Sequence, residues 1–215
     1  MRVAMILSGC GVRDGSEIHE SVCASLALQQ RGHSVEYYAP DRLQTSVFDH
    51  AHGCATKASR NILSESARIA RGQIQALSKL DVSRFDAVVF PGGMGAALNL
   101  SSYGYEGAQC TVSDDVSAVV QTAHQSGVLL GFMCIAPVIA ARLIPGARLT
   151  VGALDSTAED CQKMGAQMVA CREDEACIDE KNRIVTVPAY MKAQTLVECM
   201  KSAQALVEGL ESLKR

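Results

Sequence analysis

The fold is decided near the middle of the chain by the stretch Val128-Leu129-Leu130-Gly131-Phe132-Met133-Cys134-Ile135-Ala136-Pro137. Its first six residues form a largely apolar run that predicts a buried strand. The residues that follow predict a helix, because Val138, Ile139 and Leu143 are apolar at helical spacing. Cys134 therefore falls at a strand-to-helix turn, which is a nucleophile elbow with sulfur in place of a hydroxyl group.

Three more apolar runs, each followed by Gly, Pro or Asp, predict buried strands at 3–7, 35–38 and 87–90. Helical patterns separate the strands, the clearest over 16–30 and 113–125, with Ser16 and Ser113 as the expected N-caps. Strands that alternate with helices predict a parallel sheet. The ligand site of such a sheet lies at the carboxyl ends of its strands, where we expect three loops to meet: 8–16, 91–97 and 133–137.

The last third of the chain predicts shorter elements. Short β segments are expected at 167–171, 176–179 and 183–187, and the last two should form a small hairpin. Residues 191–213 have the apolar spacing of a final helix. We expect one domain over 1–215, an α/β flavodoxin-like three-layer sandwich with a mainly parallel sheet and a small peripheral β hairpin.

Composition argues against several functional classes. Hydrophobic residues make up 48% of the 215 residues and charged residues 20%, as in a globular protein that folds by itself. The net charge of −3 and the lack of a Lys/Arg run argue against nucleic acid as a partner. No apolar stretch reaches the roughly 20 residues that span a bilayer, and no targeting segment precedes the first strand. We therefore expect a soluble, cytoplasmic protein with no membrane partner.

The nine cysteines are scattered and form no Cys-x-x-Cys pair, so neither a metal site nor a disulfide framework is expected. Most should be small buried hydrophobic residues. At the elbow, free backbone N–H groups and the helix dipole favour a thiolate, which is the nucleophilic form of Cys134. The alternative is that Cys134 is a buried structural cysteine at the end of a strand.

The turn Phe90-Pro91-Gly92-Gly93-Met94-Gly95 follows another predicted strand. Glycines allow the backbone to approach a ligand closely and to aim its N–H groups at the ligand. The N–H groups of Gly93 and Ile135 are therefore candidates for an oxyanion hole that receives a carbonyl attacked by Cys134. A glycine-rich turn used only for tight packing is the competing interpretation.

Two carboxylates, Glu17 and Glu20, lie at the start of the first helix, where capping alone often explains them. A catalytic role requires one of them to reach Cys134. An ionised carboxylate would repel a thiolate, so that acid would have to be largely neutral and donate its proton to the sulfur. Such a group is also a candidate proton shuttle.

Three segments, 15–22, 91–100 and 131–137, in this order and on these elements, resemble the PfpI-like superfamily, which sits beside the class I glutamine amidotransferases. The segments Leu7–Val12, Asp14–Glu20, Gly131–Pro137 and Pro188–Met191 are similar to its ElbB branch, enhancing lycopene biosynthesis protein, described as a glyoxalase-like factor of isoprenoid biosynthesis. The resemblance spans most of the chain. It implies a cysteine-dependent site that uses no metal and no cofactor.

Carried over residue by residue, the resemblance places the nucleophile on Cys134, the sulfur-contacting glutamate on Glu20, and the oxyanion-hole amides on Gly93 and Ile135. Further candidates for the pocket are Cys10, Glu17, His19, Gly92 and Asn99. Many members also have a histidine shortly after the nucleophile, but none follows His124 here. A full Cys-His-Glu triad is therefore not expected.

The function expected is a glutathione-independent, glyoxalase-like conversion of 2-oxoaldehydes such as methylglyoxal to hydroxyacids, with a small aldehyde as substrate. The alternative is a non-enzymatic redox sensor or regulatory protein that uses an oxidisable Cys134. Relatives are commonly dimers, so the resemblance also implies a homodimer.

Overall fold

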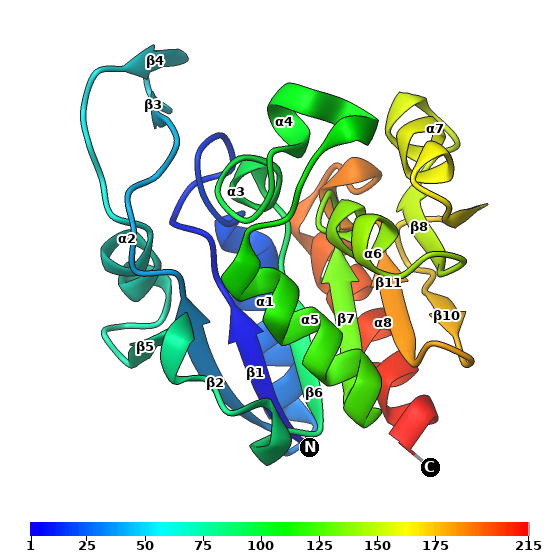
Figure 1. Cartoon of the computed structure of the whole chain (residues 1–215). Helices are drawn as coiled ribbons and strands as arrows, with labels where there is room; N and C mark the ends of the chain where they lie inside the picture. Colours follow the sequence, from blue (N-terminus) through cyan, green and yellow to red (C-terminus); the bar gives the residue numbers. More distant parts are fainter. Residues whose placement is uncertain (215) are drawn as a thin grey trace.

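Seven strands form the main sheet in a computed structural model, which describes residues 1–214 (Figure 1). In spatial order they are β10 (Cys177–Asp179), β11 (Ile184–Val187), β7 (Leu129–Met133), β6 (Ala87–Phe90), β1 (Arg2–Ile6), β2 (Ser34–Ala39) and β5 (Ile74–Ala76). Neighbouring strands are parallel except β10, which runs antiparallel to β11. The predicted α/β flavodoxin-like sandwich is confirmed, and its peripheral hairpin, β10 and β11, continues the edge of the main sheet.

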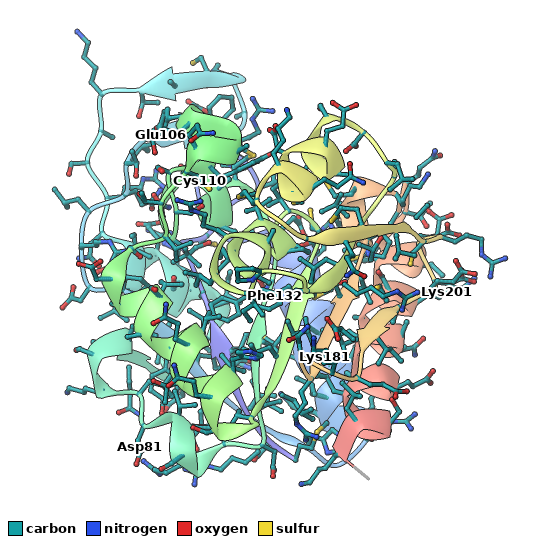
Figure 2. All side chains as sticks on the ribbon, turned by 45° about the vertical axis from the view of Figure 1, so that its right-hand side comes forward. Asp81, Glu106, Cys110, Phe132, Lys181 and Lys201 are labelled. Atoms are coloured by element: carbon teal, nitrogen blue, oxygen red, sulfur yellow. The ribbon has the colours of Figure 1, made fainter. Side chains whose placement is uncertain are left out.

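Helices cover both faces of this sheet. On one face α1 (Ile18–Gln30) packs along α8 (Leu196–Lys214), and on the other lie α5 (Asp114–Ser126) and α6 (Pro137–Leu143) (Figure 1). Every residue of β6 and β7 is buried between the two layers, which explains their continuous apolar sequences. The rings of Phe90 and Phe132 stack there with centroids 5.0 Å apart, and Figure 2 shows Phe132 in the interior.

Shorter elements complete the chain: α2 (Ile62–Ile69), α3 (Met94–Leu98), α4 (Tyr103–Glu106), α7 (Ser156–Lys163), the hairpin of β3 (Val47–Asp49) and β4 (Cys54–Thr56), and the parallel pair β8 (Arg148–Gly152) and β9 (Gln167–Ala170). The β3–β4 hairpin projects from one end of the molecule (Figure 1). The strand expected at 167–171 is present as β9, but it pairs with β8 and not with the hairpin at the sheet edge.

Two helix starts differ from the prediction. The final helix begins at Leu196 and not near 191, because a single 3₁₀ turn, Ala189–Met191, comes first. The N-cap of α1 is Glu17, whose side chain accepts a hydrogen bond from the Glu20 N–H. Ser16 is buried instead, and its hydroxyl accepts the Ser8 N–H at 2.8 Å, which ties the helix start to the end of β1.

Candidate active site

Cys134 lies at a sharp turn between β7 and α6, as the sequence predicts. Its backbone has φ = +59°, in the left-handed region that residues other than glycine rarely adopt. The Cys134 N–H donates to the Val187 carbonyl of β11 at 3.0 Å, which fixes the turn against the neighbouring strand. The residue is only 8% exposed. The turn therefore holds the sulfur at the carboxyl edge of the sheet, largely screened from solvent.

Three groups contact the sulfur of Cys134. The N–H groups of Gly93 and Ile135 donate to it, and the carboxyl group of Glu20 shares a hydrogen bond with it. Burial, followed by the charge of Glu20, raises the pKa of Cys134 well above its ordinary value, and the two N–H groups lower it only in part. The predicted thiolate at neutral pH is therefore wrong: this environment keeps the proton on the Cys134 thiol.

Glu20 is completely buried in the first turn of α1. Its Oε2 accepts the N–H of Gly92 at 2.8 Å, and its Oε1 accepts the N–H of Tyr190 at 3.1 Å. Burial raises the pKa of Glu20 to about 7, against the two backbone donors and Cys134, which lower it. Near neutral pH this carboxyl group can therefore either accept a proton or release one, as a general base or acid must.

Two glycines allow these groups to meet. A Cβ atom on Gly92 would lie against the Cβ of Cys134 and 2.6 Å from Oε2 of Glu20. Gly93 has φ = +90°, and a Cβ atom there would collide with the backbone of Glu17. The turn after β6 is therefore built for close approach of the backbone to the Glu20–Cys134 pair, which favours the functional interpretation of this glycine turn.

Glu17 and His19 flank Glu20 but do not contact the sulfur. Glu17 caps α1, and its Oε2 accepts the Glu20 N–H at 2.7 Å. His19 is exposed, and its Nδ1 lies 2.8 Å from the hydroxyl of Tyr190. Glu17 thus orders the helix start, and His19 contacts the residue whose backbone N–H reaches Glu20.

Cys10 and Asn99 lie in the loops around the mouth of the sheet. Cys10 is half-buried, and burial, followed by the charge of Glu65, raises the pKa of its thiol. Asn99 is buried, and its side-chain amide donates to the carbonyls of Ser8 and Asp14, both at 2.8 Å. Asn99 therefore braces the loop after β1, and these contacts commit both N–H groups of its amide.

Sequence reasoning missed two residues that shape this site, Tyr190 and Ser202. The segment Pro188–Met191 carried part of the family resemblance, but nothing local in it indicates a contact with Glu20. The hydroxyl of Ser202 on α8 accepts the Ala189 N–H at 2.9 Å, one residue before Tyr190. Both contacts depend on how α8 packs along α1, which a sequence pattern does not show.

The part of the chain that the structure describes contains no cluster of three or more His, Cys, Asp or Glu side chains arranged to bind a metal ion. Within residues 1–214, every helix is too short or too polar for a transmembrane span.

This fold, with a cysteine elbow after a central parallel strand and a buried glutamate from the first helix, is that of the class I glutamine amidotransferase-like superfamily, which includes the DJ-1/PfpI proteins. Comparisons with known proteins refine this class, although no family model matches the chain. The human "Glutamine amidotransferase-like class 1 domain-containing protein 3, mitochondrial" is 44% identical over 200 residues, 88% of this chain and 75% of that protein. The zebrafish "ES1 protein, mitochondrial" is 32% identical over 206 residues, 88% of this chain and 76% of that protein.

A solved structure agrees with these relatives. The isoprenoid biosynthesis protein with amidotransferase-like domain from Ehrlichia chaffeensis superimposes with a TM-score of 0.91 and 32% identity over 99% of both chains. The chain belongs to the ES1/ElbB-like family of the superfamily. The expectation of a cytoplasmic protein is wrong, because the human, rat and zebrafish relatives are all named as mitochondrial.

Proposed function

We propose that this protein is a glyoxalase-like enzyme that converts a 2-oxoaldehyde such as methylglyoxal to a hydroxyacid through Cys134, without glutathione. The observation that carries the proposal is the hydrogen-bonded pair of Glu20 and Cys134, in which burial raises the pKa of Glu20 to about 7. Beside an acid of this pKa, the Cys134 thiol does not have to lose its proton before it attacks the aldehyde. The proton can move to Glu20 as the sulfur attacks.

The first step forms a hemithioacetal. The Cys134 sulfur bonds to the aldehyde carbon, its proton passes to ionised Glu20, and the carbonyl oxygen becomes an oxyanion. The N–H groups of Gly93 and Ile135, which donate to the sulfur in the free protein, are the donors available to that oxyanion. Protonated Glu20 then returns the proton to this oxygen, which leaves a neutral adduct and an ionised Glu20.

The second step moves hydrogen between adjacent carbons. Ionised Glu20 removes the proton from the carbon bonded to sulfur, and the electrons form an enediolate. Protonated Glu20 gives this proton to the neighbouring carbon, and the hydroxyl proton of the sulfur-bearing carbon moves to the oxygen of that neighbouring carbon, which yields a 2-hydroxy thioester of Cys134. Water hydrolyses this thioester, releases the hydroxyacid and restores the thiol. Overall, the 2-oxoaldehyde and one water molecule give one hydroxyacid.

A direct assay tests the proposal. Purified protein incubated with methylglyoxal should form lactate without added glutathione, and Cys134→Ala should abolish the reaction. Cys161→Ala is a matched control, because Cys161 is likewise a buried cysteine but lies on α7. Equal rates in Cys134→Ala and the unchanged protein would refute the assignment.

The same site argues against the alternative of a redox sensor. A sensing cysteine needs a low pKa and an accessible sulfur, whereas the pKa of Cys134 is raised and the residue is 8% exposed. Mass spectrometry after mild peroxide treatment separates the two functions. Selective, reversible oxidation of Cys134 in a protein without turnover would favour the sensor.

We also propose a link to isoprenoid metabolism and a homodimeric assembly. The first is supported by the name of the Ehrlichia chaffeensis protein, which is 32% identical to this chain. The second is supported by the exposed apolar residues Ile18, Val22 and Leu26, which follow one face of α1 at intervals of four. Sedimentation of the purified protein tests the dimer.

A further inference from the structure

The 3₁₀ turn Ala189–Met191 connects β11 with α8 and sends one backbone donor into the active site. Its Tyr190 N–H donates to Oε1 of Glu20 at 3.1 Å. The Tyr190 hydroxyl also lies 2.8 Å from Nδ1 of His19, so the residue contacts α1 through its backbone and its side chain. This turn therefore joins the start of α1 to the chain that leads into α8.

The turn is strained at its first residue. Ala189 has φ = +45°, a left-handed conformation that is unfavourable for a residue other than glycine. Ala189 is completely buried, and its N–H donates to the hydroxyl of Ser202, which is also completely buried. Ser202 is thus the side-chain partner that offsets this strain, and without it a buried N–H group would lose its acceptor.

Glu20 depends on such backbone donors because no cationic side chain within residues 1–214 pairs with it. The titratable groups around it are Glu17 and Cys23 on α1, Cys134 after β7, Tyr190 in the turn and Cys199 on α8. Among residues 1–214, Glu20 forms no ion pair with a Lys, Arg or His side chain. Its carboxylate is stabilised instead by the N–H groups of Gly92 and Tyr190.

We propose that Ser202 is a positioning residue for Glu20: its hydroxyl holds the strained turn at Ala189 so that the Tyr190 N–H stays on the Glu20 carboxylate. Ser202 acts only through the backbone and lies outside the contacts of Cys134. The proposal rests on the proposed function for the part that Glu20 plays as a base, but its test does not require turnover.

The test is the pH dependence of alkylation at Cys134 by iodoacetamide, followed by mass spectrometry that resolves each cysteine. Alkylation should rise as Glu20 ionises, because ionised Glu20 accepts the thiol proton. Ser202→Ala removes the acceptor of the Ala189 N–H, and the loss of the Tyr190 donor makes ionised Glu20 less favourable. The midpoint of the rise should therefore move to higher pH by about one unit.

Three variants make this result specific. Ser212→Ala, on the same helix but exposed, should leave the midpoint unchanged. Ser202→Thr keeps the hydroxyl and should restore the original midpoint. If Ser202→Ala does not fold, Ser202→Cys keeps the size of serine with a weaker acceptor and should shift the midpoint in the same direction.

An unchanged midpoint in a folded Ser202→Ala or Ser202→Cys protein would overturn the proposal, even if that protein melts at a lower temperature. The outcome is separate from that of the proposed function. A shifted midpoint in a protein that makes no lactate would support the role of Ser202 while the glyoxalase assignment fails.

Discussion

Glu20 and Cys134 share a hydrogen bond in the interior of the protein, although one comes from the first helix and the other from the elbow after β7. Both side chains are screened from solvent. The charge of Glu20 raises the pKa of Cys134, whereas the hydrogen bond with Cys134 lowers the pKa of Glu20. The two groups therefore titrate as a pair, and the first proton lost belongs to both.

The pH dependence of Cys134 reactivity should show this coupling. In the unchanged protein, alkylation should rise in two steps, one near pH 7 as Glu20 ionises and one at alkaline pH as the thiol itself titrates. In Glu20→Gln the first step should vanish. The alkaline step should move to lower pH, because the negative charge that raises the pKa of Cys134 is gone. Cysteine-resolved alkylation rates measure both effects, and a first step that persists in Glu20→Gln would contradict the pairing.

The stability of the protein should fall as the pH rises through the titration of Glu20. Folding raises the pKa of Glu20 from about 4.5 to about 7, so the folded state binds its proton more tightly than the unfolded state does. This contribution is complete below about pH 4.5 and is lost by about pH 7, and its size is about 3 kcal/mol. Denaturant unfolding at pH 5 and pH 8 should show that loss of unfolding free energy in the unchanged protein. Glu20→Gln, which has no carboxyl group to ionise at this position, should not show it. Glu180→Gln, at an exposed position of the edge hairpin, should behave like the unchanged protein.

Replacing Gly92 with alanine should damage the site more than the fold. The added Cβ would press on Cys134 and Glu20 together, and backbone and elbow would have to move apart. We expect a destabilisation of about 1–3 kcal/mol and a loss of the first alkylation step. Gly146→Ala is the control, because a Cβ there meets no atom within 4 Å. It should cost about 1–2 kcal/mol through its positive φ and leave the reactivity of Cys134 unchanged.

Removing the imidazole of His19 should have only a small effect on chemistry. His19 contacts the Tyr190 hydroxyl, whereas Glu20 is held by the Tyr190 N–H, which the change leaves in place. We expect His19→Ala to lose at most about 1 kcal/mol of stability and to retain most of its turnover. Steady-state measurement of kcat for His19→Ala and for the unchanged protein tests this prediction. A loss of 100-fold or more in kcat would mean that His19 works directly with Cys134 after all.

Much of the fold could be predicted because the central strands are covered on both faces. Runs such as 87–90 and 128–133 are apolar throughout, and the break that follows each run marks the loops of the site. Cys134 and the glycines at 92 and 93 could be found for the same reason, since each directly follows one of these strands. The β8 strand could not, because Arg148–Gly152 is short and gains its partner only when β9 packs beside it.

The protonation state of Cys134 could not be predicted from the local pattern. Free N–H groups at a helix start do favour a thiolate, and those of Gly93 and Ile135 do donate to the sulfur. Their effect is outweighed by burial and by the charge of Glu20, which depend on the packing of distant segments. The part that Ser202 plays was hidden for the same reason, because it acts through a turn that has no sequence signal.

The elbow is completed by residues from the far end of the chain, since Val187 supplies the carbonyl for the Cys134 N–H and Tyr190 supplies a donor to Glu20. A growing polypeptide that has not yet synthesised these residues carries Cys134 as an ordinary thiol. The pairing of its thiol with Glu20 is complete only when these late residues join the fold. Burial of the Cys134 sulfur therefore marks a late stage of folding.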